Sequence, residues 1–356
     1  MDKPTVEVYE RHSDRYEAQR SPRFLEEATR FGKLVGGGPV VDLGCGPGWY
    51  TAAIGDPAVA LDAARAMLRR TAEVAPAAPP VQADLQALPF RSGSLTGAWA
   101  RNSYVHVPGT DVPMAMADLH RSLRVTAPVE LTFFGGGDVD RAVFPDDDLP
   151  GRWFSSWSTG RLSDVVVGAG FDVDELEEHT SASGEVRLTV RARRARTLPD
   201  TVGAGMRLLV CGLNPSLRAA DAGVGFVTPG NRFWPAALAA GVVTHDRDPR
   251  HALLTHGVGM TDLVKRATPR AAELTRDEYR AGVERVDRLC AWLQPAAVCV
   301  VGLAGWRAAV DRRATPGWQE RPLGGHPVYV LPSTSGLNAA IPLSVLTAHL
   351  RRATAP

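Results

Sequence analysis

The sequence is poor in cysteine, with four in 356 residues. They are Cys45, Cys211, Cys290 and Cys299. No two of them form a Cys-x-x-Cys pair, which excludes a disulfide framework, a zinc ribbon and a cysteine-ligated iron–sulfur cluster. His251 and His256 lie five positions apart and do not share a helical face. We therefore expect no metal site, and scattered free thiols are typical of a cytoplasmic protein.

Long apolar runs are also missing. No window approaches about 18 uncharged apolar residues, and the amino-terminal residues lead into a charged stretch rather than an apolar signal sequence. The sequence therefore predicts no contact with a membrane. A net charge of +1 hides an asymmetry, because residues 206–356 hold 18 Lys and Arg against 11 Asp and Glu, whereas residues 1–205 hold 22 against 28. The surplus of seven positive charges in the second half favours a polyanionic partner there.

The length of 356 residues favours two domains, and 44% hydrophobic with 22% charged residues is ample for two cores. Residues 196–205 combine Pro, Gly and small polar residues without helical or strand periodicity, which predicts a linker. We therefore expect domains at residues 1–195 and 206–356. Strand and helix patterns alternate in both, so the predicted fold class is α/β, with two doubly wound three-layer α/β/α domains.

The first half opens with amphipathic patterns over residues 5–35, which predict two helices. A strand pattern at Pro39–Leu43 then runs into the glycine turn Gly44–Gly48. Glycines at such a turn let a ligand approach backbone N–H groups that a Cβ would shield. Asp62 follows the apolar residues Val59–Leu61, where an acid at the end of a second strand would hold ribose hydroxyls.

Four segments of this half, taken in order, carry a resemblance. They read VVDLGCGPG from Val40, LDAARAML from Leu61, QADLQALPF from Gln82 and ARNSYVHV from Ala100. In these segments the first half resembles class I S-adenosylmethionine-dependent methyltransferases of the small-molecule type, over roughly residues 5–195. The alternative is a dehydrogenase that binds NAD at the same turn. Trp49 and Tyr50 stand where its fingerprint requires a small residue, which disfavours it.

The resemblance implies S-adenosylmethionine as the cofactor and assigns residues to its parts. Asp42 and the turn glycines would face the methionine end, Asp62 the ribose, and two later residues the adenine. The implied residues are Asp42, Gly44, Gly46, Gly48, Asp62, Asp84 and Leu85. The motifs of DNA base methylation, Asp/Asn–Pro–Pro–Tyr and Pro–Cys, do not occur, and the methyl acceptor stays open.

Two features of the first half have alternative interpretations. Trp153, Phe154 and Trp157 are either core residues or the wall of a substrate pocket. His106 is either a general base or a satisfied polar group.

The second half opens with the branched apolar run Arg207–Cys211, which predicts a buried parallel strand. Asn214 follows in the turn past its carboxyl end, which is where ligands bind in open α/β sheets. Phe226 lies in a loop rich in glycine, and Asn231–Trp234 opens a helix. Further elements are expected at a turn over Gly259–Val264, a helix over Asp277–Leu293 and strands at Ala297–Val301 and Val328–Leu331.

This half resembles the mismatch-specific uracil/thymine DNA glycosylases of the uracil-DNA glycosylase superfamily. It does so in Gly–Leu–Asn–Pro from Gly212, in Pro–Gly–Asn–Arg–Phe–Trp from Pro229 and in Ser–Thr–Ser–Gly–Leu–Asn from Ser333. The resemblance implies hydrolysis of the N-glycosidic bond of uracil, or of mismatched thymine-like bases, in duplex DNA. Asn214 would orient the attacking water. The residues implied for the base pocket and DNA are Phe226, Ser216, Asn231, Ser335, Gly336 and Leu337.

Each implied DNA contact has a physical reason. Phe226 offers a face on which a flipped base stacks, although a Phe in such a loop can also cap the core. Leu337, at a polar loop tip, suits a wedge that fills the gap left by the base. Ser216 replaces a glycine of the family motif, and Ala339 stands where an Arg often follows the wedge. These departures put the substrate range and the preference for a guanine partner in doubt.

The sequence thus predicts a cytoplasmic enzyme of base-excision repair, a DNA glycosylase fused to an S-adenosylmethionine-dependent methyltransferase of unknown acceptor. One alternative is a nucleic-acid-binding module that has lost catalysis and only senses the cofactor. The other is an enzyme whose main activity is methyl transfer.

Overall fold

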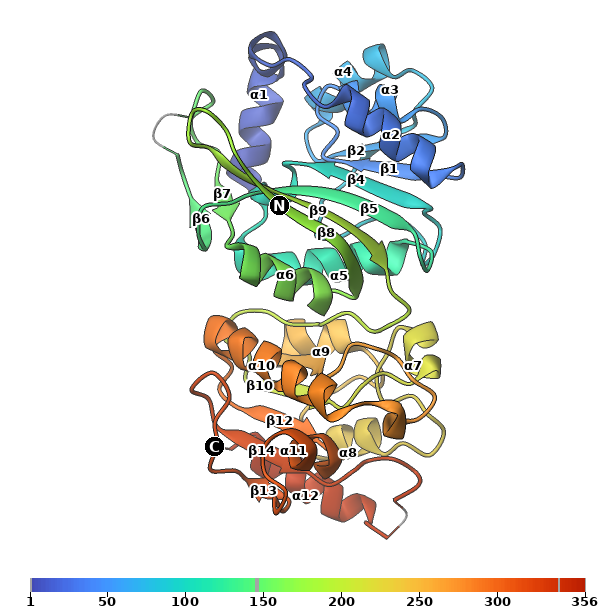
Figure 1. Ribbon diagram of the computed structural model, residues 1–356, viewed down its shortest axis with the longest axis vertical. Coiled ribbons are helices and arrows are strands. Elements are labelled where there is room, and N and C mark those ends of the chain that lie inside the picture. The colour runs from blue at the N-terminus through green and yellow to red at the C-terminus, as the bar shows by residue number, and fades with distance from the viewer. Residues whose placement is uncertain (1, 145–146, 339, 356) are drawn as a thin grey trace. The chain divides into compact units, whose positions relative to one another are not determined.

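A computed structural model of the chain describes residues 2–144, 147–338 and 340–355. It divides into two compact units (Figure 1). The first unit comprises residues 1–167 and 171–195, and the second comprises residues 168–170 and 196–356. The predicted α/β class is confirmed, since each unit is built on its own mostly parallel sheet.

The first unit is organised around a mixed sheet. Strands β3, β2, β1, β4 and β5 lie side by side and parallel, β9 pairs antiparallel with β5, and β8 forms the edge beyond β9. The short strands β7 and β6 extend from the end of β5. The strands are β1 (Val40–Leu43), β2 (Ala58–Asp62), β3 (Pro80–Gln82), β4 (Gly97–Arg101), β5 (Pro128–Phe134), β6 (Val139–Ala142), β7 (Phe154–Ser156), β8 (Phe171–Thr180) and β9 (Val186–Arg194).

Helices cover both faces of this sheet. Figure 1 shows α2, α3 and α4 on one face and α5 and α6 on the other, with α1 beside the carboxyl ends of the strands. The predicted pair of amino-terminal helices is confirmed as α1 and α2. The helices are α1 (Lys3–Gln19), α2 (Leu25–Val35), α3 (Trp49–Ile54), α4 (Arg65–Val74), α5 (Val112–Ser122) and α6 (Thr159–Gly168), with 3-10 turns at Tyr104–His106 and Gly109–Asp111.

The second unit has a sheet in the order β11–β10–β12–β14–β13, in which β13 alone is antiparallel to its neighbour. The strands are β10 (Leu208–Gly212), β11 (Val258–Asp262), β12 (Val298–Val301), β13 (Gly317–Trp318) and β14 (Val328–Leu331). The helices are α7 (Leu217–Ala222), α8 (Phe233–Ala239), α9 (Pro249–His256), α10 (Arg276–Leu293), α11 (Leu303–Ala309) and α12 (Leu343–Ala353), with a 3-10 turn at Ala271–Glu273.

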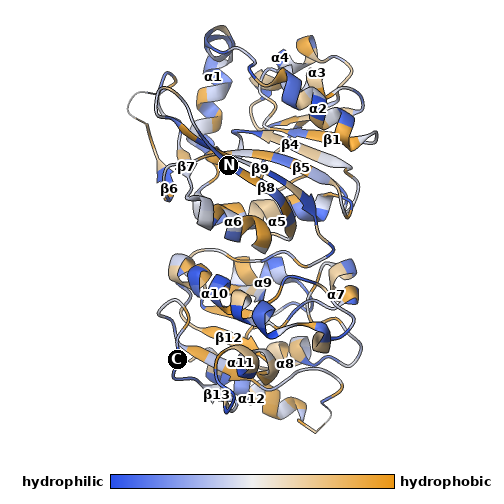
Figure 2. Cartoon of the chain, in the orientation of Figure 1, coloured by the Kyte–Doolittle hydropathy of each residue, from blue (hydrophilic) through white to orange (hydrophobic). Residues whose placement is uncertain are grey.

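Alternation along β10 builds two cores from one strand. Leu209 and Cys211 point to the face covered by α10 and α11, whereas Leu208 and Val210 point to the face covered by α8 and α12. A strand buried on both faces must be apolar throughout, which explains why it is visible in the sequence. Figure 2 shows hydrophobic colour along the central strands of this sheet.

The segment predicted as a linker, residues 196–205, packs within the second unit. Asp200 is buried and forms ion pairs with Lys265 and Arg285, at 2.8 and 2.7 Å. Burial alone would raise the pKa of Asp200, but the two cations hold it below its ordinary value. Val202 joins the core beside α10. The composition of this segment suggests a linker, but Asp200 and Val202 anchor it to the second unit.

One predicted element has a different structure. The stretch predicted as a turn, Gly259–Val264, is mostly strand β11, which pairs in parallel with β10. Glycine and aspartate in this strand weaken its sequence signal. Within the described residues, no helix is long and apolar enough to cross a membrane.

Candidate functional site

The first unit has a cavity of about 670 Å³ at the carboxyl ends of its parallel strands. Its described lining includes Gly44, Gly46 and Asp62, three of the residues implied for the cofactor. Both glycines have positive φ, 68° and 54°. A Cβ on Gly44 would stand 2.4 Å from Ser103 Cβ, so this turn requires glycine for steric reasons.

Asp62 ends β2 and is tied to the glycine turn. Its carboxylate accepts hydrogen bonds from the N–H groups of Gly46 and Ala64, at 3.0 and 2.8 Å. Burial raises the pKa of Asp62 to about 6. The carboxylate therefore stands beside the backbone that would receive the cofactor, as the ribose assignment requires.

The other implied cofactor residues lie outside the described lining of the cavity. Asp42 is buried, and its carboxylate accepts a hydrogen bond from Thr51 Oγ1 at 2.6 Å. Burial raises its pKa to about 7. Gly48 packs against α4, where a Cβ would meet Thr71 at 2.7 Å. Asp84 Oδ1 accepts the N–H of Gln86 at 2.9 Å, and Leu85 is fully buried.

His106 is a satisfied polar group. Its Nδ1 lies 2.9 Å from the carbonyl oxygen of Trp153 and must donate, so Nε2 accepts from Tyr9 Oη at 2.8 Å. Arg152 in turn donates to Tyr9 Oη at 2.9 Å. Burial lowers the pKa of His106 to about 4. With both nitrogens engaged, this neutral histidine fixes α1 to the unit and is not placed to act as a base.

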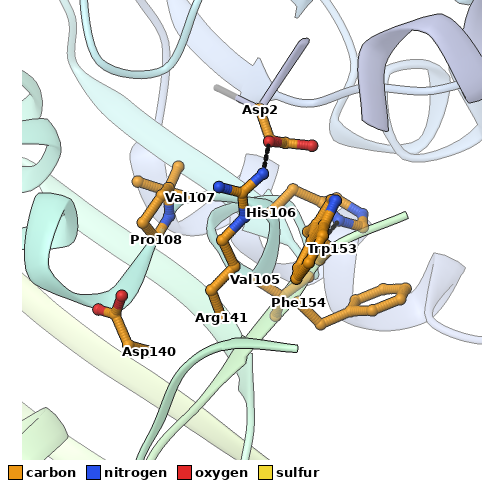
Figure 3. Close-up of a pocket in the computed structure, with 9 residues that line it drawn as sticks. All are labelled: Asp2, Val105, His106, Val107, Pro108, Asp140, Arg141, Trp153 and Phe154. Carbon is orange, nitrogen blue, oxygen red and sulfur yellow. Dashed lines mark hydrogen bonds and ion pairs between the residues drawn. The ribbon is translucent and has the colours of Figure 1, made fainter. Parts of the chain in front are cut away.

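The three aromatic residues near His106 have separate roles. Trp157 is core, with 2% of its surface exposed. Phe154 lines the cavity and stacks on Phe144, with ring centroids 4.7 Å apart. Figure 3 shows Arg141 between Trp153 and Asp2, and it forms an ion pair with Asp2. The residues drawn there leave no room for a bound molecule between them.

In the second unit, Asn214 lies just past β10 with its amide held in one orientation. Nδ2 donates to the carbonyl of Arg266 at 3.0 Å and to Thr268 Oγ1 at 2.8 Å. Because a carbonyl only accepts, this contact fixes which end of the amide is nitrogen. Oδ1 accepts no hydrogen bond from the described residues, and Asn214 is half-buried. The carbonyl end of this side chain is therefore free to bind water.

Phe226 lies beside the same strand end. Its φ of 60° is unusual for a residue with a side chain, and its ring stacks on Phe233 with centroids 4.2 Å apart. A Cβ on Gly212 would come within 3.5 Å of the Phe226 ring. Phe226 thus packs partly on the core, and its ring also lies next to Gly212, the last residue of β10, two residues before Asn214.

Asp262 is a candidate that sequence reasoning missed. It ends β11, opposite Gly212, and its Oδ1 would lie 2.2 Å from a Cβ built at Gly212. Its carboxylate accepts no hydrogen bond from the described residues, and burial raises its pKa to about 6. The available signal is an acid at the carboxyl end of a strand, but the composition of this strand predicts a turn.

The loop Ser333–Asn338 presents Leu337 to solvent with 99% of its surface exposed. Arg232 holds the loop in place. Its guanidinium donates to the carbonyls of Ser335 and Asn338 at 3.1 and 2.7 Å and also to that of Ile341. Gly336 packs so closely that a Cβ there would stand 3.1 Å from the carbonyl oxygen of Gly230. The exposed leucine therefore lies on a loop tip that Arg232 and the close approach of Gly336 to Gly230 support.

Two of the implied DNA residues hydrogen-bond to the first turn of a helix, and Ser216 is the N-cap of its helix. Ser216 Oγ accepts the N–H of Ala219 at 3.1 Å and begins α7. Asn231 Oδ1 accepts the N–H of Phe233, the first residue of α8, at 3.0 Å. Ala339 lies outside the described residues.

Comparison with known proteins identifies both halves. The Uracil DNA glycosylase superfamily matches residues 199–346, and a family described as Methyltransferase domain matches residues 40–126. A solved structure of 1,6-didemethyltoxoflavin-N1-methyltransferase from Burkholderia thailandensis is 16% identical, covers 55% of this chain and 92% of its own, and has a TM-score of 0.45. An S-adenosylmethionine-dependent methyltransferase from Mesorhizobium loti is 20% identical, covers 47% and 96%, and has a TM-score of 0.39. The chain is therefore a fusion of a methyltransferase domain, residues 40–126, with a uracil DNA glycosylase superfamily domain, residues 199–346.

Proposed function

We propose that the chain carries two activities. Residues 206–356 act as a mismatch-specific DNA glycosylase that hydrolyses the N-glycosidic bond of uracil, or of a mismatched thymine-like base, in duplex DNA. Residues 1–195 bind S-adenosylmethionine and act as a methyltransferase.

The fixed amide of Asn214 is the observation that carries the first proposal. A glycosylase needs a water molecule held against C1′ of the flipped nucleotide. Oδ1 of Asn214 is free to accept a hydrogen bond from that water, and its direction is set by the hydrogen bonds that Nδ2 donates to Pro215, Arg266 and Thr268. Orientation built in before the substrate arrives is what makes a positioned polar group catalytically useful.

The leaving base needs little help. As the C1′–N bond breaks, the bonding electrons pass to the base, and uracil is a stable anion without prior protonation. A neutral amide is a weak base, so Asn214 orients the water without deprotonating it. Asp262 reaches the same end of the sheet, and we propose that its carboxylate accepts a proton released from the attacking water.

Two apolar residues suit access to the base. A base inside a duplex must leave the stack before it can be cleaved. The exposed Leu337, on a loop tip held by Arg232, suits insertion into the gap. The Phe226 ring provides a surface near Asn214 against which the flipped base can stack.

For the first unit, the fit to the cofactor rests on the cavity and its glycine turn. Gly44 and Gly46 expose backbone, and Asp62 offers a carboxylate for the ribose hydroxyls. S-adenosylmethionine supplies an activated methyl group when it is bound. His106 is neutral and fully hydrogen-bonded, so it contributes to the shape of the cavity rather than to proton transfer.

The direct test is base release from defined duplexes. Uracil opposite guanine, uracil opposite adenine and thymine opposite guanine are incubated with the chain, and the abasic product is quantified. Release of uracil is expected, with a rate that depends on the opposite base. Binding to all three duplexes without release would instead favour a module that has lost catalysis.

A further inference from the structure

Arg101, the last residue of β4, lines the cavity of the first unit and has no acidic partner among the described residues. Its guanidinium lies over the ring of Phe24, 3.4 Å from the centroid, and Nη1 donates to Thr132 Oγ1 at 3.1 Å. A guanidinium has five N–H donors, and these two contacts use one of them. Among the described carboxylates, none forms an ion pair with it.

Three other arginines of the cavity differ in this respect, whereas Arg23, which also lines it, forms no ion pair with the described residues. Arg20 is paired with Asp148 at 2.7 Å, Arg187 with Glu185 at 2.8 Å, and Arg152 with Asp147. Burial and the positive charge of Arg187 lower the pKa of Arg101 to about 10. A half-buried cation beside another cation is stabilised when an anion approaches.

An aromatic wall shares a face of the sheet with Arg101. Arg101 lies opposite Thr132 on β5, and Phe134 lies opposite Arg187 on β9. Thr132 and Phe134 are two residues apart on one strand and so point to the same face. The ring of Phe134 contacts the rings of Phe154 and Phe144, with centroid distances of 5.6 and 5.9 Å.

We propose that this cavity binds a small planar aromatic carboxylate. Its carboxylate meets the free donors of Arg101, and its ring lies against the wall formed by Phe134, Phe144 and Phe154. A guanidinium presents two parallel N–H groups that match the two oxygens of a carboxylate. Residues 1–205 carry 28 acidic against 22 basic residues, which disfavours a polyanionic nucleic acid as the molecule bound here. The proposal rests on the methyltransferase function, for which this molecule is the methyl acceptor.

The test compares two probes that differ only in charge. Binding of 6-hydroxy-2-naphthoate and of the neutral 6-hydroxy-2-naphthamide to the full chain is measured by fluorescence, with and without S-adenosylhomocysteine. The acid should bind about tenfold more tightly than the amide, as is typical of a hydrogen bond to a charged group. Arg101→Met, which keeps an apolar stem on Phe24, should abolish this preference. Arg193→Gln is the control for loss of a positive charge, because Arg193 lies on β9, pairs with Asp174 and is not among the described residues that line the cavity.

Two results would overturn the assignment. Equal affinities of the acid and the amide for the wild type would show that no carboxylate site exists. If Arg101→Met weakens S-adenosylhomocysteine but not methylthioadenosine, which lacks the amino-acid carboxylate, then Arg101 serves the cofactor instead. Failure of the wild type to bind S-adenosylhomocysteine would contradict the proposed cofactor. The relative affinity of the acid and the amide, measured without S-adenosylhomocysteine, would still show whether the carboxylate site exists.

Discussion

Asp262 combines a free carboxylate with a raised pKa of about 6, against an ordinary 3.8. The folded chain therefore retains a proton between about pH 4 and 6 that the unfolded chain releases. The free energy of unfolding should fall as the pH rises through this window. Asp262→Asn removes the titrating group, so at pH 7.5 the variant should be more stable than the wild type, on the order of 1 kcal/mol.

The same substitution should slow the enzyme. If Asp262 accepts the proton of the attacking water, base release should fall by roughly 10²-fold. The wild-type rate should rise with pH through about 6, and the variant should lack this step. Denaturant unfolding and single-turnover base release, both measured across pH, test the pair of effects. A variant that is less stable but equally active would show that Asp262 is only structural.

Asp62 sets a second pH dependence. Its pKa of about 6 means that the carboxylate is protonated in mild acid, when it accepts ribose hydroxyls poorly. The affinity for S-adenosylhomocysteine, measured by calorimetry, should therefore rise with pH and level off above about pH 6. Asp62→Asn should bind more weakly, by on the order of 1.5–3 kcal/mol, without this step. An unchanged affinity in the variant would refute the ribose assignment.

The sequence predicts the role of a single residue where residue type and position along a strand are enough to suggest it. Asn214 is recognisable because it follows an apolar strand within a distinctive motif. Asp42 is equally recognisable, yet its carboxylate faces Thr51 inside the unit, which strand position alone does not reveal. The free N–H donors of Arg101 are not visible in the sequence, and neither is the hydrogen bonding that prevents His106 from acting as a base. Both depend on partners up to 97 positions away in the sequence.

Among the elements, the loop Ser333–Asn338 carries the clearest prediction. Leu337→Ala should reduce release of uracil from duplex DNA far more than from single-stranded DNA, which has no stack to open. Unstacking costs a few kcal/mol per base step, so the duplex rate should fall by roughly tenfold or more. Parallel rate measurements on the two substrates test this, and equal losses would indicate a damaged loop.

The hydrogen bonds that support this loop can be removed without changing Leu337 at its tip. Arg232→Met removes the bonds to the carbonyls of Ser335, Asn338 and Ile341 while retaining Leu337. We again expect the rate of uracil release to fall on duplex DNA and not on single-stranded DNA, because a loop tip without these hydrogen bonds loses conformational entropy when it inserts into the duplex. Restoration of the duplex rate by Arg232→Lys would show that charge alone suffices and would argue against the three-carbonyl geometry.

Elements with uniform patterns are predictable from the sequence, whereas those with mixed patterns are not. Strand β10 is apolar on both faces, and helix α10 has a regular apolar stripe together with a Thr275–Glu278 capping box. Strand β11 reads Val–Gly–Met–Thr–Asp, which lacks branched residues at most positions. Its strand conformation depends on pairing with β10, a contact between distant segments that local sequence does not encode.

For the whole molecule, the uneven charge predicts where DNA binds. Residues 206–356 have a surplus of seven positive charges, and residues 1–205 a deficit of six. A fragment of residues 196–356, which retains the buried Asp200, should bind duplex DNA with an affinity that falls steeply with salt. A fragment of residues 1–195 should bind weakly. Equal salt-dependent binding by both, measured by fluorescence anisotropy, would contradict this division.

The two-unit α/β architecture was predictable because alternating strand and helix patterns restrict the possible topologies. The position of residues 196–205 was not, since Asp200 and Val202 gain meaning only from Arg285 and the core beside α10. The antiparallel pairing of β8 with β9 likewise depends on contacts that local periodicity does not specify.

If Asn214 orients the attacking water, its removal should be felt in the single-turnover release of uracil from a uracil–guanine duplex. Asn214→Ala also loses the hydrogen bonds to Arg266 and Thr268, so its stability should fall by about 1 kcal/mol. Thr275→Ala, which removes the cap of α10, is the control for a stability loss of similar size. Asn214→Ala should lower the rate by roughly 10²–10³-fold, whereas Thr275→Ala should leave it unchanged. An unchanged rate in folded Asn214→Ala would refute the role of Asn214 in orienting the water.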